Sequence, residues 1–249
     1  MPRADIELII FCATKHESVA ACRVQTPPPR PVTVGGRRAL RGILAGRPCL
    51  TVASGSGPEA ADRMCRDVTS EVHPRLIVNF GAAGAVGRLS VGTLTVPREI
   101  LAYSWPKLEQ EGETLVRPVE SLADLVPSVR LTRAGSCPHD IRDAAIRDRL
   151  RDTLHIETTD WETYRLALFC ESRRIPFVAL RCITDFCDAA APVTYGRNVL
   201  QVLDAGAKLL ESLVEAAWTT LVQPPPTLVE ASATPLEPTA TPPEPPPAP

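Results

Sequence analysis

Short apolar runs alternate with amphipathic segments along most of the chain. The runs 8–13, 76–86 and 178–183 are continuous enough to be strands that are buried on both faces. A helix is expected after the first run, opened by Lys15–Glu17. Another is expected before the last run, because Leu166, Phe169 and Cys170 fall on one helical face. The pattern favours an α/β domain in which helices cover a central sheet.

Turn residues divide the remaining sequence into further elements. A proline-rich loop over 26–31 ends the first helix, and a hairpin is expected around Gly46–Pro48. The loop Ser54–Pro58 leads into the next helix; its N–H groups either line a site or form a plain strand-to-helix turn. The other expected elements are hairpin strands 40–44 and 49–53, strands 95–101, 130–134 and 154–158, and helices 140–152 and 197–221.

Composition divides the chain into one folded domain and a tail. Residues 1–222 are long enough for a single hydrophobic core. Residues 223–249 consist mainly of Pro, Thr, Ala and Glu, which cannot bury a core. We therefore expect a disordered tail with a tendency to polyproline conformation.

Net charge, cysteine spacing and hydropathy argue against nucleic acid, metal and membrane as partners. The formal net charge of −2 offers no basic field for nucleic acid. The eight cysteines lack a Cys-x-x-Cys pair, and the four histidines share no ligand spacing with them, so we expect buried thiols in a reducing cytoplasm and no metal. No stretch approaches the roughly 20 apolar residues of a membrane span, and no signal peptide is evident.

Three carboxylates follow predicted strands and are candidates for chemistry. Asp185 ends the strand over 178–183, at the edge of the sheet where ligands bind, although an Asp there could simply cap a helix. Glu162 and Glu17 are each expected in the first turn of a helix, where acids commonly complement the helix dipole. The small residues Gly81–Gly84 could form a turn that lets a ligand approach the backbone.

Four segments together resemble the purine nucleoside phosphorylase and nucleosidase superfamily. Their sequences are similar to the family motifs NTGSAGG, VGDIVV, DME or EME, and RAISD, in this order: 78–84, 91–96, 160–162 and 181–185. The loop 54–57 is also similar to the family's SGIG. The resemblance covers residues 6–222 and is closest to nucleosidases that cleave methylthioadenosine and S-adenosylhomocysteine. It implies a three-layer α/β sandwich with a central mixed, partly closed β-sheet.

The resemblance also implies a role for each matching residue. Asp185 matches the general acid that protonates N7 of the leaving purine, and Glu162 matches the acid that binds the ribose hydroxyls. Glu17 and Arg181 match the pair that holds the attacking water. Gly81 and Thr184 fall within the substrate-binding motifs. The resemblance further implies a small-molecule nucleoside substrate, no cofactor and a homo-oligomer.

Three departures from the family pattern bear on the substrate. Trp161 stands where the family has Met beneath the sugar, and Ala82 replaces a Ser or Thr that helps to hold ribose or phosphate. Residues 135–141 lack the family's base-binding pattern and look more like divergent members, including hopanoid-associated phosphorylases. The identity of the substrate is therefore open.

Three functions compete at this point. Hydrolysis of a purine nucleoside is favoured because Glu17, Glu162 and Arg181 are all retained. The second is phosphorolysis, in which arginines of the segment 37–41 would bind phosphate unless they are solvated charges at a strand edge. The third is a nucleoside-binding protein that has lost turnover through Trp161.

Overall fold

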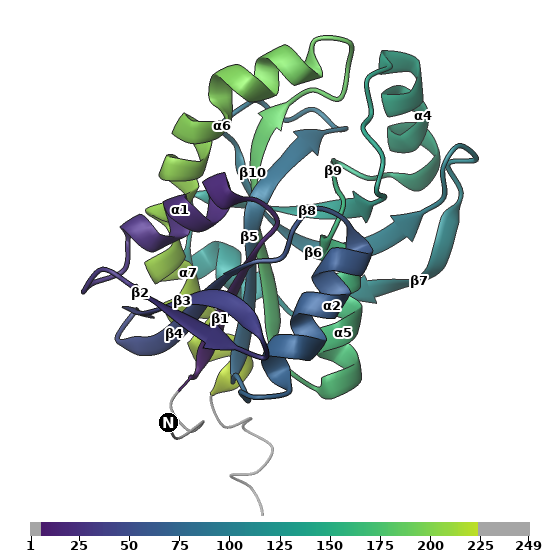
Figure 1. Ribbon diagram of the computed structural model, residues 1–249. Coiled ribbons are helices and arrows are strands. Elements are labelled where there is room, and N and C mark those ends of the chain that lie inside the picture. Colours follow the sequence, from purple (N-terminus) through teal and green to yellow (C-terminus); the bar gives the residue numbers. More distant parts are fainter. Residues whose placement is uncertain (1–5, 224–249) are drawn as a thin grey trace, which may run out of the picture.

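A mixed sheet runs through the computed structural model, which describes residues 6–223 (Figure 1). Its ten strands are β1 (Leu8–Cys12), β2 (Arg30–Val34), β3 (Arg37–Leu44), β4 (Arg47–Ala53), β5 (Leu76–Ala85), β6 (Leu94–Tyr103), β7 (Gln110–Val116), β8 (Val129–Ser136), β9 (Thr158–Asp160) and β10 (Phe177–Asp185). The helices are α1 (Lys15–Arg23), α2 (Pro58–Thr69), α3 (Glu120–Leu125), α4 (Ala144–Leu154), α5 (Thr163–Arg173), α6 (Ala191–Ala207) and α7 (Leu210–Ala217), followed by a π-helical turn over Trp218–Val222.

One part of the sheet closes on itself. The strand order is β10-β6-β8-β9-β5-β1-β4-β3-β2, β7 pairs with β6, and β10 also pairs with β5. Strands β5, β9, β8, β6 and β10 therefore form a ring, and β1 to β4 continue from β5 as an open wing. The expectation of a mixed, partly closed sheet is confirmed.

Alternate side chains of the central strands pack into different layers. In β1, Leu8 and Ile10 belong to the core beneath α1, α6 and α7, whereas Ile9 and Phe11 belong to the core beneath α2 and α5. Figure 1 shows these two groups of helices on opposite sides of the sheet. Each central strand is buried on both faces, which explains its continuous apolar sequence.

The structure corrects several boundaries that the sequence suggested. Residues 81–85 continue β5 as a strand, because they pair with β10 and β9 instead of turning. Helix α4 begins only at Ala144, where the Asp143 carboxylate accepts the N–H of Ala145 (2.8 Å). The strand expected over 154–158 is β9, which starts at Thr158 opposite Ala134 of β8.

Other differences arise from elements that the pattern did not reveal. The helix expected over 197–221 begins at Ala191, with Pro192 in its first turn, and is divided into α6 and α7. Strands β2 and β7 and helix α3 were not expected, and most of their residues are exposed. The hairpin of β3 and β4 was predicted correctly. The expected tail over 223–249 lies outside the described residues, apart from Gln223.

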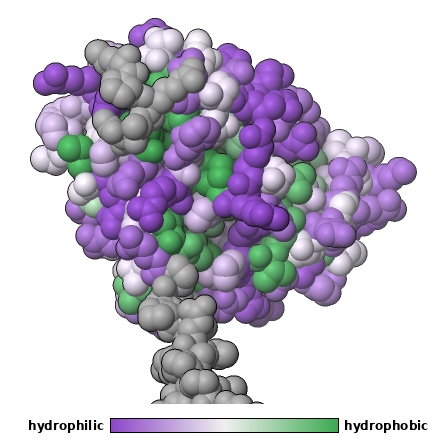
Figure 2. Space-filling view, turned by 90° about the horizontal axis from the view of Figure 1, so that it is seen from below, coloured by the Kyte–Doolittle hydropathy of each residue, from purple (hydrophilic) through white to green (hydrophobic). Residues whose placement is uncertain are grey.

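The surface and the thiols agree with a folded globular domain. Figure 2 shows hydrophilic side chains around separate hydrophobic patches on the face seen from below. Within residues 6–223, no helix is long and apolar enough to cross a bilayer. All eight cysteines are free and seven are buried, which fits the expectation of buried thiols.

Candidate active site

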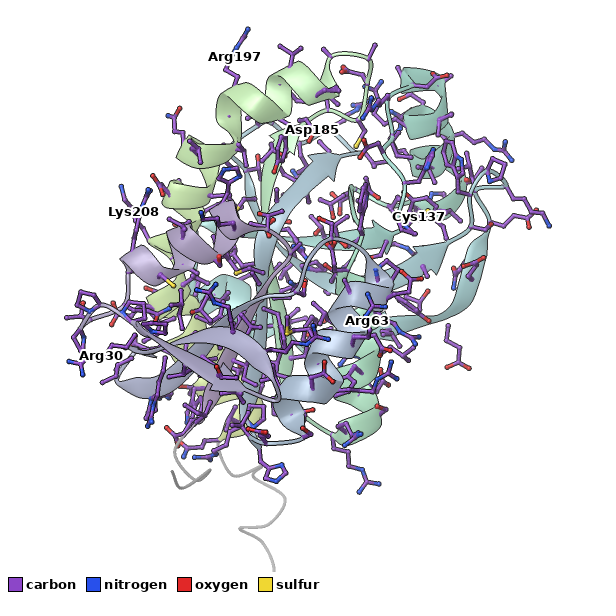
Figure 3. All side chains as sticks on the ribbon, in the orientation of Figure 1. Arg30, Arg63, Cys137, Asp185, Arg197 and Lys208 are labelled. Atoms are coloured by element: carbon purple, nitrogen blue, oxygen red, sulfur yellow. The ribbon has the colours of Figure 1, made fainter. Side chains whose placement is uncertain are left out.

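A cavity of about 400 Å³ lies beside the last residues of β1, β9 and β10. Figure 3 shows Asp185 at the end of β10 and close to α6. Five groups of residues line the cavity: Ala13, Thr14 and Glu17; Ser56; Ala82–Gly84; His139–Arg142 and Thr159–Glu162; and Thr184, Asp185, Cys187, Ala191, Pro192 and Tyr195. Glu17, Glu162 and Asp185, which are distant in sequence, thus face one space.

Asp185 lines the cavity with both carboxylate oxygens anchored. Its Oδ1 accepts the N–H of Cys187 (3.1 Å), and its Oδ2 accepts the Thr184 hydroxyl (2.9 Å). Burial raises the pKa of Asp185, and the nearby Asp188 and Asp140 charges act in the same direction. A carboxyl group held in place with a raised pKa is suited to giving a proton to a ligand.

Glu17 is buried in the first turn of α1 and has two backbone partners. Its Oε2 accepts the N–H of Thr14 (2.8 Å), whose hydroxyl in turn accepts the N–H of Glu17, and the two form a capping box. Its Oε1 accepts the N–H of Ala82 in β5 (2.9 Å). The side chain therefore belongs to the capping box of its helix, at a position where an acid also complements the helix dipole, and it reaches across to the cavity.

Gly81 lies between Glu17 and Arg181. The two strands place Arg181 of β10 directly beside Gly81 of β5. A Cβ on Gly81 would lie 2.6 Å from Glu17 Oε1 and 2.6 Å from Arg181 Nη1. Gly81 does not line the cavity; it leaves the space in which the carboxylate and the guanidinium approach each other.

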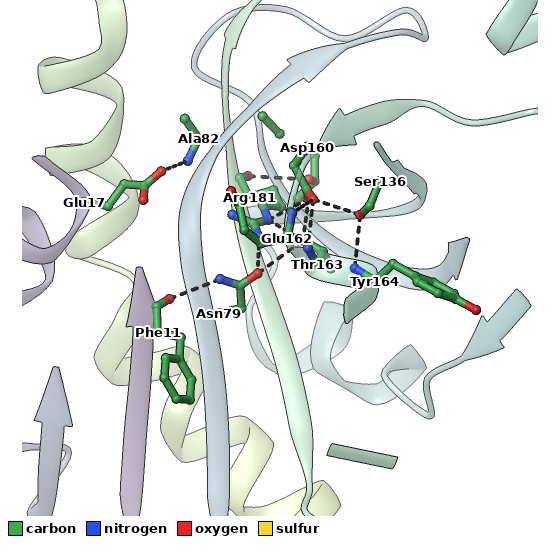
Figure 4. A network of polar contacts seen from close by, with 12 residues as sticks. Phe11, Glu17, Asn79, Ala82, Ser136, Asp160, Glu162, Thr163, Tyr164 and Arg181 are labelled. Carbon is green, nitrogen blue, oxygen red and sulfur yellow. Dashed lines mark hydrogen bonds and ion pairs between the residues drawn. The ribbon is translucent and has the colours of Figure 1, made fainter. Parts of the chain in front are cut away.

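Arg181 is almost fully buried and is held by Asp160 rather than by Glu17. Its Nε lies 3.0 Å from Asp160 Oδ2 and 2.8 Å from the Thr163 hydroxyl oxygen, and its Nη2 donates to Asn79 and Thr163. Figure 4 shows this network beside β5. The sequence predicts a carboxylate partner for a buried arginine, and the structure identifies Asp160 as that partner.

Glu162 is the N-cap residue of α5 and not a residue of its first turn. Its Oε1 accepts the N–H of Gly57 (2.7 Å), so the loop 54–58 contributes a backbone donor to the site. Gly57 has φ +98°, a conformation that strongly favours glycine. Burial, followed by the Asp160 charge, raises the pKa of Glu162 to about 7.

Trp161 forms part of the cavity wall and is only half-buried. A second hollow of about 550 Å³, lined largely by α2 and α5, has Trp161 in its wall as well. Trp161 thus borders two hollows, and the expectation that it contacts a bound ligand stays a prediction.

The remaining residues show what sequence patterns found and missed. Ala82 and Thr184 line the cavity, and their role in binding substrate stays a prediction. The sequence did not single out Tyr195 and Pro192 of α6 or Thr14, which also line it. An Asn inside the apolar strand β5 was a usable signal, because Asn79 proves to be an Arg181 partner. Within residues 6–223, no group of three or more His, Cys, Asp or Glu side chains is arranged to hold a metal ion.

Comparison with known proteins adds a family and a set of similar folds. Residues 7–134 match the family model described as the phosphorylase superfamily. A 5′-methylthioadenosine/S-adenosylhomocysteine nucleosidase of Bacillus cereus is 24% identical over 221 residues, which cover 80% of this chain and 93% of that relative. The native futalosine hydrolase of Helicobacter pylori superposes with a TM-score of 0.74 at 16% identity, covering 84% of this chain and 97% of that one. A 5′-methylthioadenosine/S-adenosylhomocysteine nucleosidase of Neisseria meningitidis, solved with methylthio-immucillin-A, superposes with a TM-score of 0.74 at 18% identity. The superposition covers 86% of this chain and 99% of that one.

Proposed function

We propose that this chain, which belongs to the phosphorylase superfamily, hydrolyses the N-glycosidic bond of a purine nucleoside. The observation that carries the proposal is the convergence of Glu17, Glu162 and Asp185 on one cavity. The similarity to a nucleosidase of Bacillus cereus supports the same reaction class.

Each carboxylate has a separate task in this reaction. Asp185 gives its proton to N7 of the purine as the bond between C1′ and the base breaks. Glu162 accepts hydrogen bonds from the ribose hydroxyls, and its negative charge stabilises the positive charge that develops on the sugar. Water adds to C1′ and loses a proton to Glu17, while Arg181 Nη1 helps to orient it. The products are free base and free sugar.

The charges around the cavity favour water over phosphate. Its lining includes five carboxyl groups and one arginine, Arg142, which pairs with Asp140 (2.6 Å). A phosphate dianion between Glu17 and Glu162 would meet two like charges. The arginines considered for a phosphate clamp, Arg37, Arg38 and Arg41, lie on β3 and do not line the cavity.

A panel of nucleosides tests the proposal directly. Full-length protein is incubated with adenosine, inosine, methylthioadenosine and S-adenosylhomocysteine, and free base is measured by chromatography. We expect release of base from at least one of them. Thermal stabilisation by the same compounds without release of base would instead support the nucleoside-binding alternative.

A further inference from the structure

The Asp160 carboxylate lines the cavity but has no oxygen left for a ligand. Its Oδ1 accepts the Ser136 hydroxyl (2.9 Å) and the N–H groups of Glu162 (3.0 Å) and Thr163 (2.9 Å). Its Oδ2 accepts the Thr163 hydroxyl and pairs with Arg181 Nε (3.0 Å). A carboxylate has about four acceptor positions, and these five donors occupy them. Asp160 therefore acts on neighbouring side chains and not on the substrate.

The partners of Asp160 belong both to the side of the site that holds the nucleophile and to the side that binds the sugar. On one side, Asp160 contacts Nε of Arg181, and Asn79 and Thr163 accept hydrogen bonds from Nη2. The remaining nitrogen, Nη1, is therefore directed toward Gly81 and Glu17. On the other side its Oδ1 holds the backbone at 162 and 163, which directs the Glu162 carboxylate to Gly57.

We propose that Asp160 is the positioning residue of this site, which aligns Arg181 for the nucleophile and Glu162 for the sugar at the same time. The inference rests on the proposed nucleosidase function. It assigns to Asp160 an effect on turnover that a helix cap alone would not have. A cap would affect only how much protein is folded.

The central variant is Asp160→Asn in the full-length chain. An amide keeps one acceptor oxygen but places an NH₂ group or a neutral oxygen opposite Arg181 Nε, so the ion pair is lost. Because the interaction orients groups that act on the transition state, we expect kcat to fall about 10- to 100-fold, with a smaller change in KM. Glu99→Gln is the matched control, since it removes a partly buried ion pair with Arg133 (2.6 Å) and neither residue lines the cavity, so turnover should stay near wild type.

The pH profile separates positioning from a merely structural role. The charged groups that act on Glu162 are Asp160 and Glu17, which raise its pKa, and Arg181, which lowers it; the Gly57 N–H also lowers it. Glu162 must be ionised to accept the ribose hydroxyls. Loss of the Asp160 charge should therefore move the acidic limb of kcat/KM to lower pH, by about one unit. Partial unfolding would lower kcat/KM by the same factor at every pH and would leave the acidic limb where it is.

Thr163→Val provides a second test if Asp160→Asn does not fold. It removes the hydroxyl that bridges Asp160 and Arg181 but keeps the Asp160 charge. We expect a several-fold lower kcat with the acidic limb unchanged. If Asp160→Asn folds, a wild-type kcat together with an unmoved pH profile would overturn the inference. If Asp160→Asn does not fold, a wild-type kcat of folded Thr163→Val would overturn it. Absence of base release by the wild-type protein would instead overturn the proposed function.

Discussion

Glu17 Oε1 and Arg181 Nη1 each lie 2.6 Å from the point that a Cβ on Gly81 would occupy. One group comes from the first turn of α1 and the other from the middle of β10, so no local sequence feature brings them together. They meet because β5 pairs with β10 in register and carries a residue without a side chain at this position. We place the nucleophilic water at the Glu17 carboxylate, which lines the cavity, with Arg181 Nη1 close by.

Gly81→Ala should remove this arrangement. The methyl group cannot fit without displacing Glu17 and Arg181, so we expect base release to fall by about two orders of magnitude. The measurement is steady-state base release by folded protein. Gly196→Ala is the control, because a Cβ at Gly196 in α6 meets nothing within 4 Å, and its activity should match wild type. Equal activity of the two variants would contradict the placement of the nucleophile.

Asp185→Asn should separate proton transfer from binding. The amide can keep the contacts with Cys187 and Thr184 but cannot act as the acid, so kcat should fall by about 100-fold or more while the protein stays folded. Asp152→Asn is the control, because Asp152 is exposed, pairs with Arg151 (2.9 Å) and lies outside the site. Turnover of Asp185→Asn close to that of Asp152→Asn would show that Asp185 is not the acid.

The sequence predicted the strands that carry the site better than the contacts within it. Continuous apolar runs identified β1, β5 and β10, because strands buried on both faces need such residues. The role of Asp160 could not be predicted, since its partners Ser136 and Arg181 come from strands that meet only in the closed sheet. Gly81 was expected in a turn, because a small residue in a strand and a small residue in a turn look alike in sequence. Tyr195 was missed because the start of α6 carries no apolar period at that point.

Trp161→Met should change which substrates are accepted. The indole separates the cavity from the second hollow, and a flexible, narrower side chain should partly join them. We expect a higher kcat/KM for methylthioadenosine relative to inosine, with little loss of stability because Trp161 is half-buried. Competition assays with both nucleosides measure this ratio. An unchanged ratio together with a marked drop in melting temperature would show that Trp161 serves packing alone.

The buried Glu162 carboxyl should make stability depend on pH in a defined window. Its pKa is raised from 4.5 to about 7, so the folded state holds a proton that the unfolded state has lost between these values. Its contribution is therefore greatest at low pH and is lost as pH rises toward 7, by on the order of 3 kcal/mol. Glu162→Gln should remove this slope. Urea unfolding of both proteins at pH 5 and pH 8 measures it, and identical pH dependence in the two proteins would contradict the raised pKa.

The nucleophile is tested most directly by the products formed with and without phosphate. Wild-type protein and Glu17→Gln are incubated with the best nucleoside of the panel in phosphate-free buffer and again with added phosphate. We predict that wild type releases base and free sugar at the same rate in both buffers. Glu17→Gln, which lacks the base that receives the water proton, should lose at least about 100-fold in rate. Release of base that requires phosphate and yields a sugar 1-phosphate would contradict hydrolysis and establish a phosphorylase instead.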